Sequence, residues 1–156
     1  MEGKLLIQNG RVLPMTGKVI PKGSVLIENG KITAVAERIE VPDTGSTEII
    51  DASGCLVMPG LIEAHCHVGI TEEKKGMEGD DCNENVSPVT PWLRAIDAVN
   101  TMDAAFDDAV RAGITSIMAG PGSSNVVGGQ FAFIKTKGRR IDDLIEKAPA
   151  AMKIAF

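Results

Sequence analysis

The chain of 156 residues carries a net charge of −5 and 44% hydrophobic residues, which is enough apolar material for a folded core. Its 16 Lys and Arg residues are scattered among 21 Asp and Glu residues, which argues against binding to nucleic acid or to an anionic membrane surface. Because no apolar run approaches the roughly 18 residues of a membrane helix and the N-terminus lacks a secretory leader, we expect a cytoplasmic protein that acts on a small soluble molecule.

The first part of the chain is predicted to form short strands. In KLLIQNGRVL, residues 4–13, a strand is followed by an Asn9-Gly10 turn and a second strand. SVLIENGKITAVAE, residues 24–37, repeats this arrangement around Asn29-Gly30, the dipeptide that two-residue hairpin loops prefer. Two further apolar runs, at 48–50 and 55–58, complete a small β module.

From Pro59 onward the sequence changes character. LIEAH, residues 61–65, is predicted to be a buried strand, and the acidic segment after it has no periodicity and is predicted to be a loop. Carboxylates between Glu72 and Glu84 would overhang a site at the end of that strand. They are interpreted either as substrate contacts or as ordinary solvated side chains.

Two helices are predicted next. Thr90 followed by Pro91 indicates a helix start, and Trp92, Ile96 and Val99 then recur on one face. For the second helix, residues 102–112, the helical period divides the side chains into an inward and an outward set. The inward set is Met102, Ala105, Phe106, Ala109 and Val110, and the outward set is Asp103, Asp107 and Asp108.

The order of these elements predicts a parallel sheet. Gly113 would end the second helix, and the strand ITSIM, residues 114–118, follows at once, which is typical of a βα unit. FAFIKT, residues 131–136, and AAMKIAF, residues 150–156, are two more candidate strands, separated by a short helix in IDDLIEK, residues 141–147. FAFIKT is interpreted either as a barrel strand or as part of a hairpin.

The loop between the second strand and FAFIKT is rich in Gly and Ser. Residues 120–124 and 128–130 could present backbone N–H groups to a substrate oxygen or phosphate, and ordinary loop glycines are the alternative. The sequence contains no phosphate-binding GxxxxGK[ST] motif, so a nucleotide P-loop is excluded.

Both histidines of the chain, His65 and His67, lie at the end of LIEAH. Residues i and i+2 of a strand project from the same face with Cα atoms about 6.6 Å apart, so the two rings can converge on one divalent ion, while Cys66 points to the opposite face. A catalytic zinc site needs further ligands and one position for water, which two histidines do not provide. Histidines with no ligand role are the alternative.

The segment DASGCLVMPGLIEAHCHVG, residues 51–69, resembles the first metal-binding signature of the amidohydrolase superfamily, in particular of imidazolonepropionase-like members. The Asn-Gly module before it resembles the small β-sandwich that precedes the barrel in many members. PVTPWLRAIDAVNTMDAAFDDAVRAGITSI, residues 88–117, is similar to their first helical region and second barrel strand.

This resemblance implies an α/β fold with two parts. Residues 1–58 would be part of a small β-sandwich domain, and residues 59–156 would be the N-terminal part of a metal-dependent hydrolase (β/α)8 TIM barrel with its first three or four strands. Because a complete barrel takes about 250 residues, the chain is expected to be a fragment.

The activity implied by the resemblance is hydrolysis of amide C–N bonds, with cyclic amides as the expected substrates, by attack of a metal-activated water. His65 and His67 would be metal ligands, and the cofactor would be one or two divalent ions, most of all zinc. In the family, two further His ligands and an Asp that transfers protons follow later strands. The sequence offers none of these, so catalytic residues stay unassigned and the chain alone is expected to be inactive.

Other roles are weighed beside this one. Lys153 would be a carboxylated lysine that bridges two metals, or an ordinary strand lysine. A non-catalytic structural or assembly module, and a simple metal-binding protein in which Glu63 joins the two histidines, are the rival functions. The expected partners are a small-molecule amide substrate and, in the full-length protein, further copies of itself or a complementing chain.

Overall fold

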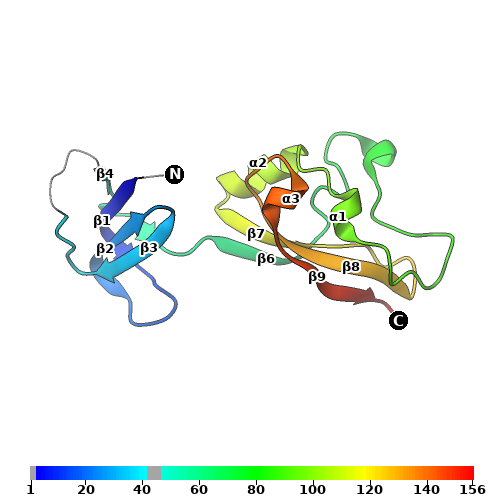
Figure 1. Ribbon diagram of the computed structural model, residues 1–156, viewed down its shortest axis with the longest axis horizontal. Helices are drawn as coiled ribbons and strands as arrows, with labels where there is room; N and C mark the ends of the chain where they lie inside the picture. The colour runs from blue at the N-terminus through cyan, green and yellow to red at the C-terminus, as the bar shows by residue number, and fades with distance from the viewer. Residues whose placement is uncertain (1–2, 42–46) are drawn as a thin grey trace. The chain divides into compact units, whose positions relative to one another are not determined.

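The computed structural model of the protein describes residues 3–41 and 47–156 and divides into two compact units, Met1–Pro59 and Gly60–Phe156 (Figure 1). Within the described residues, no helix combines the length and the apolar composition required to cross a lipid bilayer. The assignment of the first unit to a β-sandwich and of the second to a barrel stays a prediction.

The first unit is a single sheet in the described residues. It contains β1 (Lys4–Val12), β2 (Ile20–Glu28), β3 (Lys31–Ala36), β4 (Thr47–Asp51) and β5 (Leu56–Val57). The order is β3-β2-β1-β4, and β5 also pairs with β1. β1, β2 and β3 are antiparallel neighbours, whereas β4 and β5 run parallel to β1.

The Asn29-Gly30 hairpin is confirmed. Glu28 pairs with Lys31 across the turn, and both central residues have positive φ, 51° at Asn29 and 76° at Gly30. Two positive φ values are what the favoured two-residue hairpin turn requires, and Asn followed by Gly adopts them with little steric cost.

The predicted hairpin at Asn9-Gly10 is wrong, because β1 runs straight through this dipeptide. Asn9 does have a positive φ of 65°, but here it produces an irregularity in the pairing with β2. The Asn9 amide donates to Asp51 Oδ1 at 2.9 Å, and a Cβ on Gly10 would lie 2.6 Å from Val57 Cγ2. Contacts with β4 and β5 therefore hold the dipeptide as a bulge within one strand.

The second unit has a four-stranded sheet in the order β6-β7-β8-β9. Its strands are β6 (Leu61–Cys66), β7 (Ile114–Ala119), β8 (Val127–Lys135) and β9 (Ile145–Ile154). Its helices are the 3-10 turn η1 (Gly76–Gly79), α1 (Ala95–Ala98), α2 (Ala104–Arg111) and α3 (Ile141–Leu144). In Figure 1, α1, α2 and α3 all lie on the same side of this sheet.

The strand directions confirm one part of the sequence prediction and correct another. β6 and β7 are parallel neighbours, and α2 lies between them in the sequence, as a βα unit requires. β8 is antiparallel to β7, and β9 is antiparallel to β8, so the count of three or four successive barrel strands is not met. Only residues 120–126 join β7 to β8, and a connection this short favours a hairpin.

The predicted helix start at Thr90-Pro91 is wrong. Thr90 is buried, its Oγ1 donates to the Val127 carbonyl at 3.0 Å, and Arg94 forms a bridge with Gln130. The chain thus runs alongside β8 before it turns into α1, which has a single turn. Trp92, expected to share a helix face with Ile96 and Val99, is 66% exposed, whereas those two side chains pack against the core.

The second predicted helix is confirmed as α2, and Gly113, with φ of 80°, follows its end. Phe106 is buried as expected, but Met102 is exposed and Asp103 is buried. Asp103 occupies the N-cap position, where its Oδ1 accepts a hydrogen bond from the Glu73 backbone N–H at 3.2 Å. This tertiary contact explains why a residue expected to face outward is buried.

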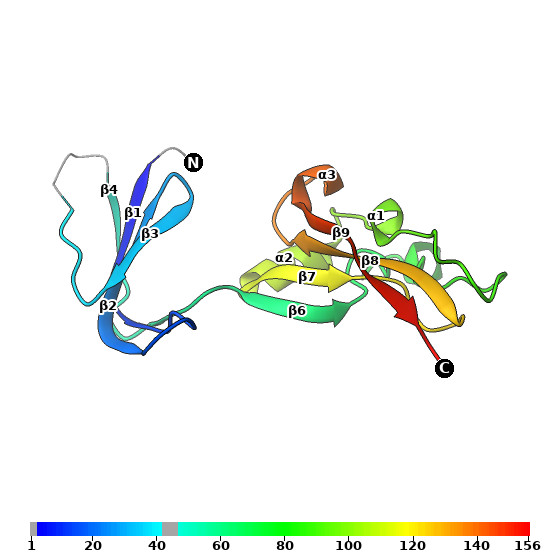
Figure 2. The same cartoon turned by 60° about the horizontal axis from the view of Figure 1, so that its bottom comes forward.

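The core of the second unit lies between the sheet and its helices (Figure 2). Ile117 of β7 and Ile134 of β8 are the largest fully buried side chains, and Phe106 and Leu144 cover them from the helices. Since Ala132 and Ile134 face this core, alternation directs Phe131 and Phe133 to the other face of the sheet.

The expectation that LIEAH is a buried strand is not met. Leu61 is 49% exposed and Ile62 is 61% exposed. β6 lies at the end of the strand order, where β7 is its one neighbour among the described strands. Apolar side chains of such an edge strand remain open to solvent on the side that no further strand covers.

Candidate metal site

The two histidines lie where the parallel strands β6 and β7 end. His65 is near the end of β6, and His67 follows the strand directly. The centroids of their rings are 5.6 Å apart and the ring planes are nearly perpendicular, at 89°. The structure therefore brings the two predicted ligands side by side, and their binding of a metal stays a prediction.

The orientation of His67 is set by a backbone group on the neighbouring strand end. His67 Nδ1 lies 2.7 Å from the carbonyl oxygen of Gly120, which follows β7. A carbonyl only accepts hydrogen bonds, so Nδ1 must carry the proton, and in the neutral ring the lone pair then resides on Nε2. Histidines that bind metals commonly make this kind of contact through the ring nitrogen that does not bind the ion.

His65 is held by an aromatic neighbour. The centroid of its ring is 5.2 Å from that of Phe131, with an interplanar angle of 62°. Phe131 comes from β8 and is 5% exposed. The sequence analysis placed Gly120 in a loop that could present backbone N–H groups to a substrate, but its N–H donates to the Cys66 carbonyl instead. The contact of the Gly120 carbonyl with His67 and the role of Phe131 were not predicted, because they depend on the pairing of β8 with β7, which no local pattern reveals.

Cys66 lies on the other side of β6, as alternation predicts. Its Sγ lies 3.6 Å from the Met118 carbonyl oxygen, and the side chain packs against the helix-covered core. Burial raises the pKa of the Cys66 thiol, and the negative charge of Glu63 adds to this rise. Because its side chain faces this core, on the opposite side of the strand from the histidines, Cys66 is best interpreted as a packing residue.

Glu63 does not complete the site. Its Oε1 accepts a hydrogen bond from the His65 backbone N–H at 3.0 Å, so the carboxylate turns back onto its own strand. Among residues 3–41 and 47–156, no group of three or more His, Cys, Asp or Glu side chains is placed to hold a metal ion. The two imidazoles therefore fit part of a metal site, and the rival in which Glu63 joins them lacks structural support.

Lys153 lies on β9 directly opposite Gly129 of β8, two positions from the pair formed by Phe131 and Ala151. Paired residues share a face of the sheet, so Lys153 is on the same face as Phe131. The pairing is compatible with either interpretation of this lysine, and a bridging role stays a prediction.

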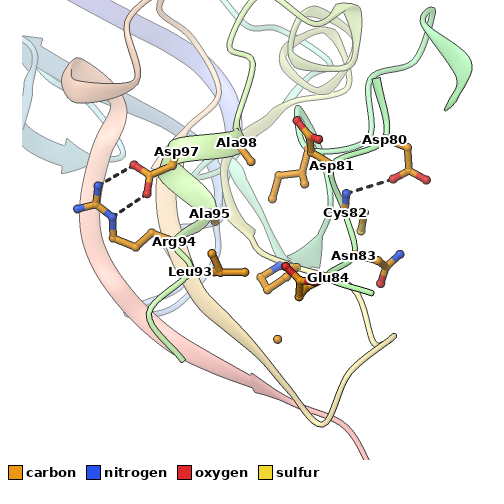
Figure 3. A pocket seen from close by; sticks show the side chains of 13 residues that line it. Asp80, Asp81, Cys82, Asn83, Glu84, Leu93, Arg94, Ala95, Asp97 and Ala98 are labelled. Carbon is orange, nitrogen blue, oxygen red and sulfur yellow. Dashed lines mark hydrogen bonds and ion pairs between the residues drawn. The ribbon is translucent and has the colours of Figure 1, made fainter. Parts of the chain in front are cut away.

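The acidic loop lines a separate pocket of about 350 Å³ (Figure 3). Asp80, Asp81 and Glu84 contribute from the loop, and Arg94 and Asp97 from the opposite wall; neither histidine lines it. The Arg94 guanidinium binds the Asp97 carboxylate through two contacts of 2.8 and 2.7 Å.

Two carboxylates in and around this loop, those of Asp97 and Glu72, are partly neutralised by neighbouring side chains. The hydrogen bonds and charge of Arg94 hold the pKa of Asp97 below its usual value. Glu72, at the start of the loop, lies outside the pocket lining and accepts a 2.6 Å hydrogen bond from the Asn100 amide, which lowers the pKa of its carboxyl together with Lys75. Of the acidic residues expected to overhang a site, Asp80, Asp81 and Glu84 line this pocket, and Glu72 is engaged outside it. The Asp80 carboxylate accepts hydrogen bonds from the Thr71 hydroxyl and the Cys82 backbone N–H, and the Glu84 carboxylate accepts them from two backbone N–H groups, of Val86 and Ser87.

Comparison with known proteins adds to this geometry. No family model matches the sequence. An amidohydrolase from Hapsidospora irregularis, tasK, is 35% identical over 132 residues, which are 83% of this chain and 13% of that protein. A 5-methylthioadenosine/S-adenosylhomocysteine deaminase from Symbiobacterium thermophilum is 44% identical over 70 residues, 44% of this chain and 16% of that protein.

A solved structure shares the fold. The crystal structure of an amidohydrolase from Thermotoga maritima MSB8 matches with a TM-score of 0.90 and 41% identity, over 97% of this chain and 39% of that one. The chain thus spans much less than two thirds of the length of each of these relatives.

Proposed function

Because this chain belongs to the amidohydrolase superfamily, we propose that it supplies the first two metal ligands, His65 and His67, of an enzyme that hydrolyses C–N bonds. Its relatives are named amidohydrolases and deaminases, which supports this reaction class. We further propose a small amide, in particular a cyclic one, as the substrate. In this proposal β6 and β7 are the first two strands of a TIM barrel, whose active sites lie at the C-terminal ends of the strands.

One observation carries the proposal. His67 Nδ1 donates to the Gly120 carbonyl at 2.7 Å, which leaves the lone pair on Nε2, and the centroid of the His65 ring lies 5.6 Å from that of His67. Two imidazoles at the ends of adjacent parallel strands, one with its tautomer already fixed, are suited to bind a divalent ion such as zinc.

The residues of this chain would bind and orient. His65 and His67 would together bind one metal ion, in a site that holds one or two such ions. The Gly120 carbonyl would keep the proton of His67 on Nδ1 while the metal is bound. When bound, such an ion would supply a water of pKa about 7 and a Lewis acid for the substrate carbonyl. A general acid or base is not assigned, because no carboxylate in the described residues joins the two rings.

Hydrolysis should be tested on the protein encoded by the complete reading frame that contains this segment. Hydantoin and dihydrouracil would probe cyclic amides and adenosine would probe deamination, each with and without a chelator. We expect hydrolysis that chelation abolishes and zinc restores, and that His65→Asn or His67→Asn reduces to background. The control is Cys55→Ser, which alters an exposed thiol of the first unit.

The 156-residue chain alone is expected to be inactive in the same assay, since the described residues offer two ligands. A non-catalytic assembly module is the alternative function, in which the protein of the complete reading frame binds its partners and hydrolyses nothing. Full assembly of the His65→Asn, His67→Asn double variant, together with no metal-dependent hydrolysis by the unaltered protein, would favour that alternative. Association with further copies or with a complementing chain remains part of the proposal.

A further inference from the structure

We propose that Phe131 is a positioning residue for both histidines, which holds His65 by direct contact and His67 through Gly120. This inference rests on the proposed function, because it concerns how the two candidate ligands are oriented. Phe131 belongs to β8, outside the segment that carries the histidines, and its ring contacts His65 and covers Gly120.

The first route is direct. The rings of Phe131 and His65 meet edge to face, with centroids 5.2 Å apart and an angle of 62°. Aromatic rings favour this geometry, because the positive edge of one ring meets the negative face of the other. Since Phe131 is 5% exposed and fixed in the sheet, it gives His65 a rigid neighbour on a strand that is otherwise exposed.

The second route passes through the backbone. Ala119 pairs with Ala132 in the antiparallel β7–β8 register, so one step further Gly120 comes opposite Phe131. A Cβ on Gly120 would lie 2.2 Å from Phe131 Cδ1 and 2.4 Å from Cε1. The ring therefore covers the α-carbon of Gly120, and only a glycine allows this approach.

The peptide groups around Gly120 are also tied to β6. The Gly120 N–H donates to the Cys66 carbonyl at 3.2 Å, and its carbonyl accepts from His67 Nδ1 at 2.7 Å. The ring of Phe131 covers the residue between these two bonds. Without it, Gly120 regains its backbone freedom, and the carbonyl that selects the His67 tautomer is no longer held in place.

The test uses the tautomer of His67 in the 156-residue chain without metal, read from two-bond ¹H–¹⁵N correlations of the imidazoles. The chain has only two histidines, so the spectrum is simple to assign. We expect the unaltered chain to show the proton of neutral His67 on Nδ1. In Phe131→Ala, this preference should be lost, and zinc affinity should fall about 10- to 100-fold, as is typical when a group that orients a ligand is removed.

Phe133→Ala is the matched control. Phe133 is on the same strand and, by alternation, on the same face, but it pairs with Met118 and Lys147 instead of Gly120. We expect it to leave the tautomer and the zinc affinity unchanged. Phe131→Tyr, which keeps the ring, should retain both properties, and Phe131→Leu provides a milder test if the alanine variant does not fold.

The possible outcomes separate the two proposals. A folded Phe131→Ala or Phe131→Leu variant with the tautomer and zinc affinity of the unaltered chain would overturn the positioning role, as would an equal change in Phe133→Ala. If the unaltered chain binds no zinc but the tautomer still depends on Phe131, the expectation that His65 and His67 bind zinc without further ligands fails, while the orienting contact stands.

Discussion

The Asn29-Gly30 turn in the first unit and the histidine pair in the second show two ways in which a short motif acquires its geometry. The turn is determined locally, since both positive φ values fall within the dipeptide and no heavy atom outside it and its chain neighbours lies within 4 Å of a Cβ built on Gly30. The histidine pair depends on Gly120 and Phe131, more than fifty residues along the chain. Substitution of distant residues should therefore leave the Asn29-Gly30 turn unchanged, whereas substitution of Gly120 or Phe131 should alter the orientation of the two histidines.

The largest expected effect comes from the core behind the histidines. Ile134 is fully buried, and Ile134→Ala should lower the free energy of unfolding of the second unit by about 4 kcal/mol, from lost burial and the cavity left behind. Hydrogen exchange measured by mass spectrometry would localise the loss. The control is Ile154→Ala at a 51% exposed position, for which a change below about 0.5 kcal/mol is expected. Equal losses of unfolding free energy in the two variants would show that burial of Ile134 does not stabilise the sheet.

Gly120→Ala should have the next largest effect and couples stability to the site. Its Cβ would overlap the Phe131 ring, so we expect a loss of about 3 kcal/mol by overpacking, together with weaker zinc binding. Denaturant unfolding and zinc titration would measure the two quantities. Gly17→Ala is the control, because nothing lies within 4 Å of its added Cβ. Unchanged zinc affinity in a folded Gly120→Ala variant would contradict the described link to His67.

At the turn, Gly30→Ala should cost about 1 kcal/mol, because its φ of 76° disfavours a side chain while the surrounding space is open. Hydrogen exchange of β2 and β3 would report the loss, and Asn29→Gly should be nearly neutral. The histidine tautomer should remain the same in both variants. A changed histidine tautomer in either variant would contradict the claim that the turn is independent of the histidine pair.

The smallest effect concerns pH. The hydrogen bond from the Asn9 amide, followed by those from Ser53, lowers the pKa of Asp51. A lowered pKa stabilises the fold at pH values above the unfolded pKa of about 3.9, and this contribution is lost as the pH falls through the folded pKa. Asn9→Ala should therefore raise the pKa of Asp51 in a carboxyl NMR titration and reduce the pH dependence of the stability of the first unit below about pH 4. An unchanged Asp51 titration would show that Asn9 does not hold the carboxylate.

Glu72 and Asn100 in the second unit form a similar carboxylate–amide pair, and they serve as the comparison for Asp51 and Asn9. Asn100 and Lys75 lower the pKa of Glu72, so Asn100→Ala should raise it without affecting Asp51. High salt should remove only the contribution of the Lys75 charge to the lowered pKa of Glu72, since the hydrogen bond from the neutral Asn100 amide is the larger cause.

How far the sequence predicted this molecule depends on the range of the interactions. The Asn29-Gly30 hairpin, α2 with Gly113 after it, and the parallel β6–β7 pair follow from short periodic patterns and are confirmed. Thr90-Pro91 has the local signature of a helix start, but a hydrogen bond to the distant Val127 carbonyl places it alongside β8. Asn9-Gly10 has the signature of a hairpin, but Asp51 and Val57 hold it within a strand.

The site follows the same rule. Alternation along the strand correctly predicted that His65 and His67 lie side by side and that Cys66 points to the other face of the strand. It could not indicate that Gly120 fixes a tautomer or that Phe131 contacts His65, since both depend on the antiparallel return of β8. The candidate ligands were thus accessible from the sequence, whereas their contacts with Gly120 and Phe131 required the fold.

The most direct test of the account is a zinc titration of the chain followed at the imidazole nitrogens of its two histidines. We predict that the His65 and His67 signals shift together over one range of zinc concentration, that His67 keeps its proton on Nδ1, and that either histidine substitution abolishes the shift of the other. Independent shifts at different zinc concentrations, or binding of zinc through Nδ1 of His67, would contradict the claim that these residues form one metal site.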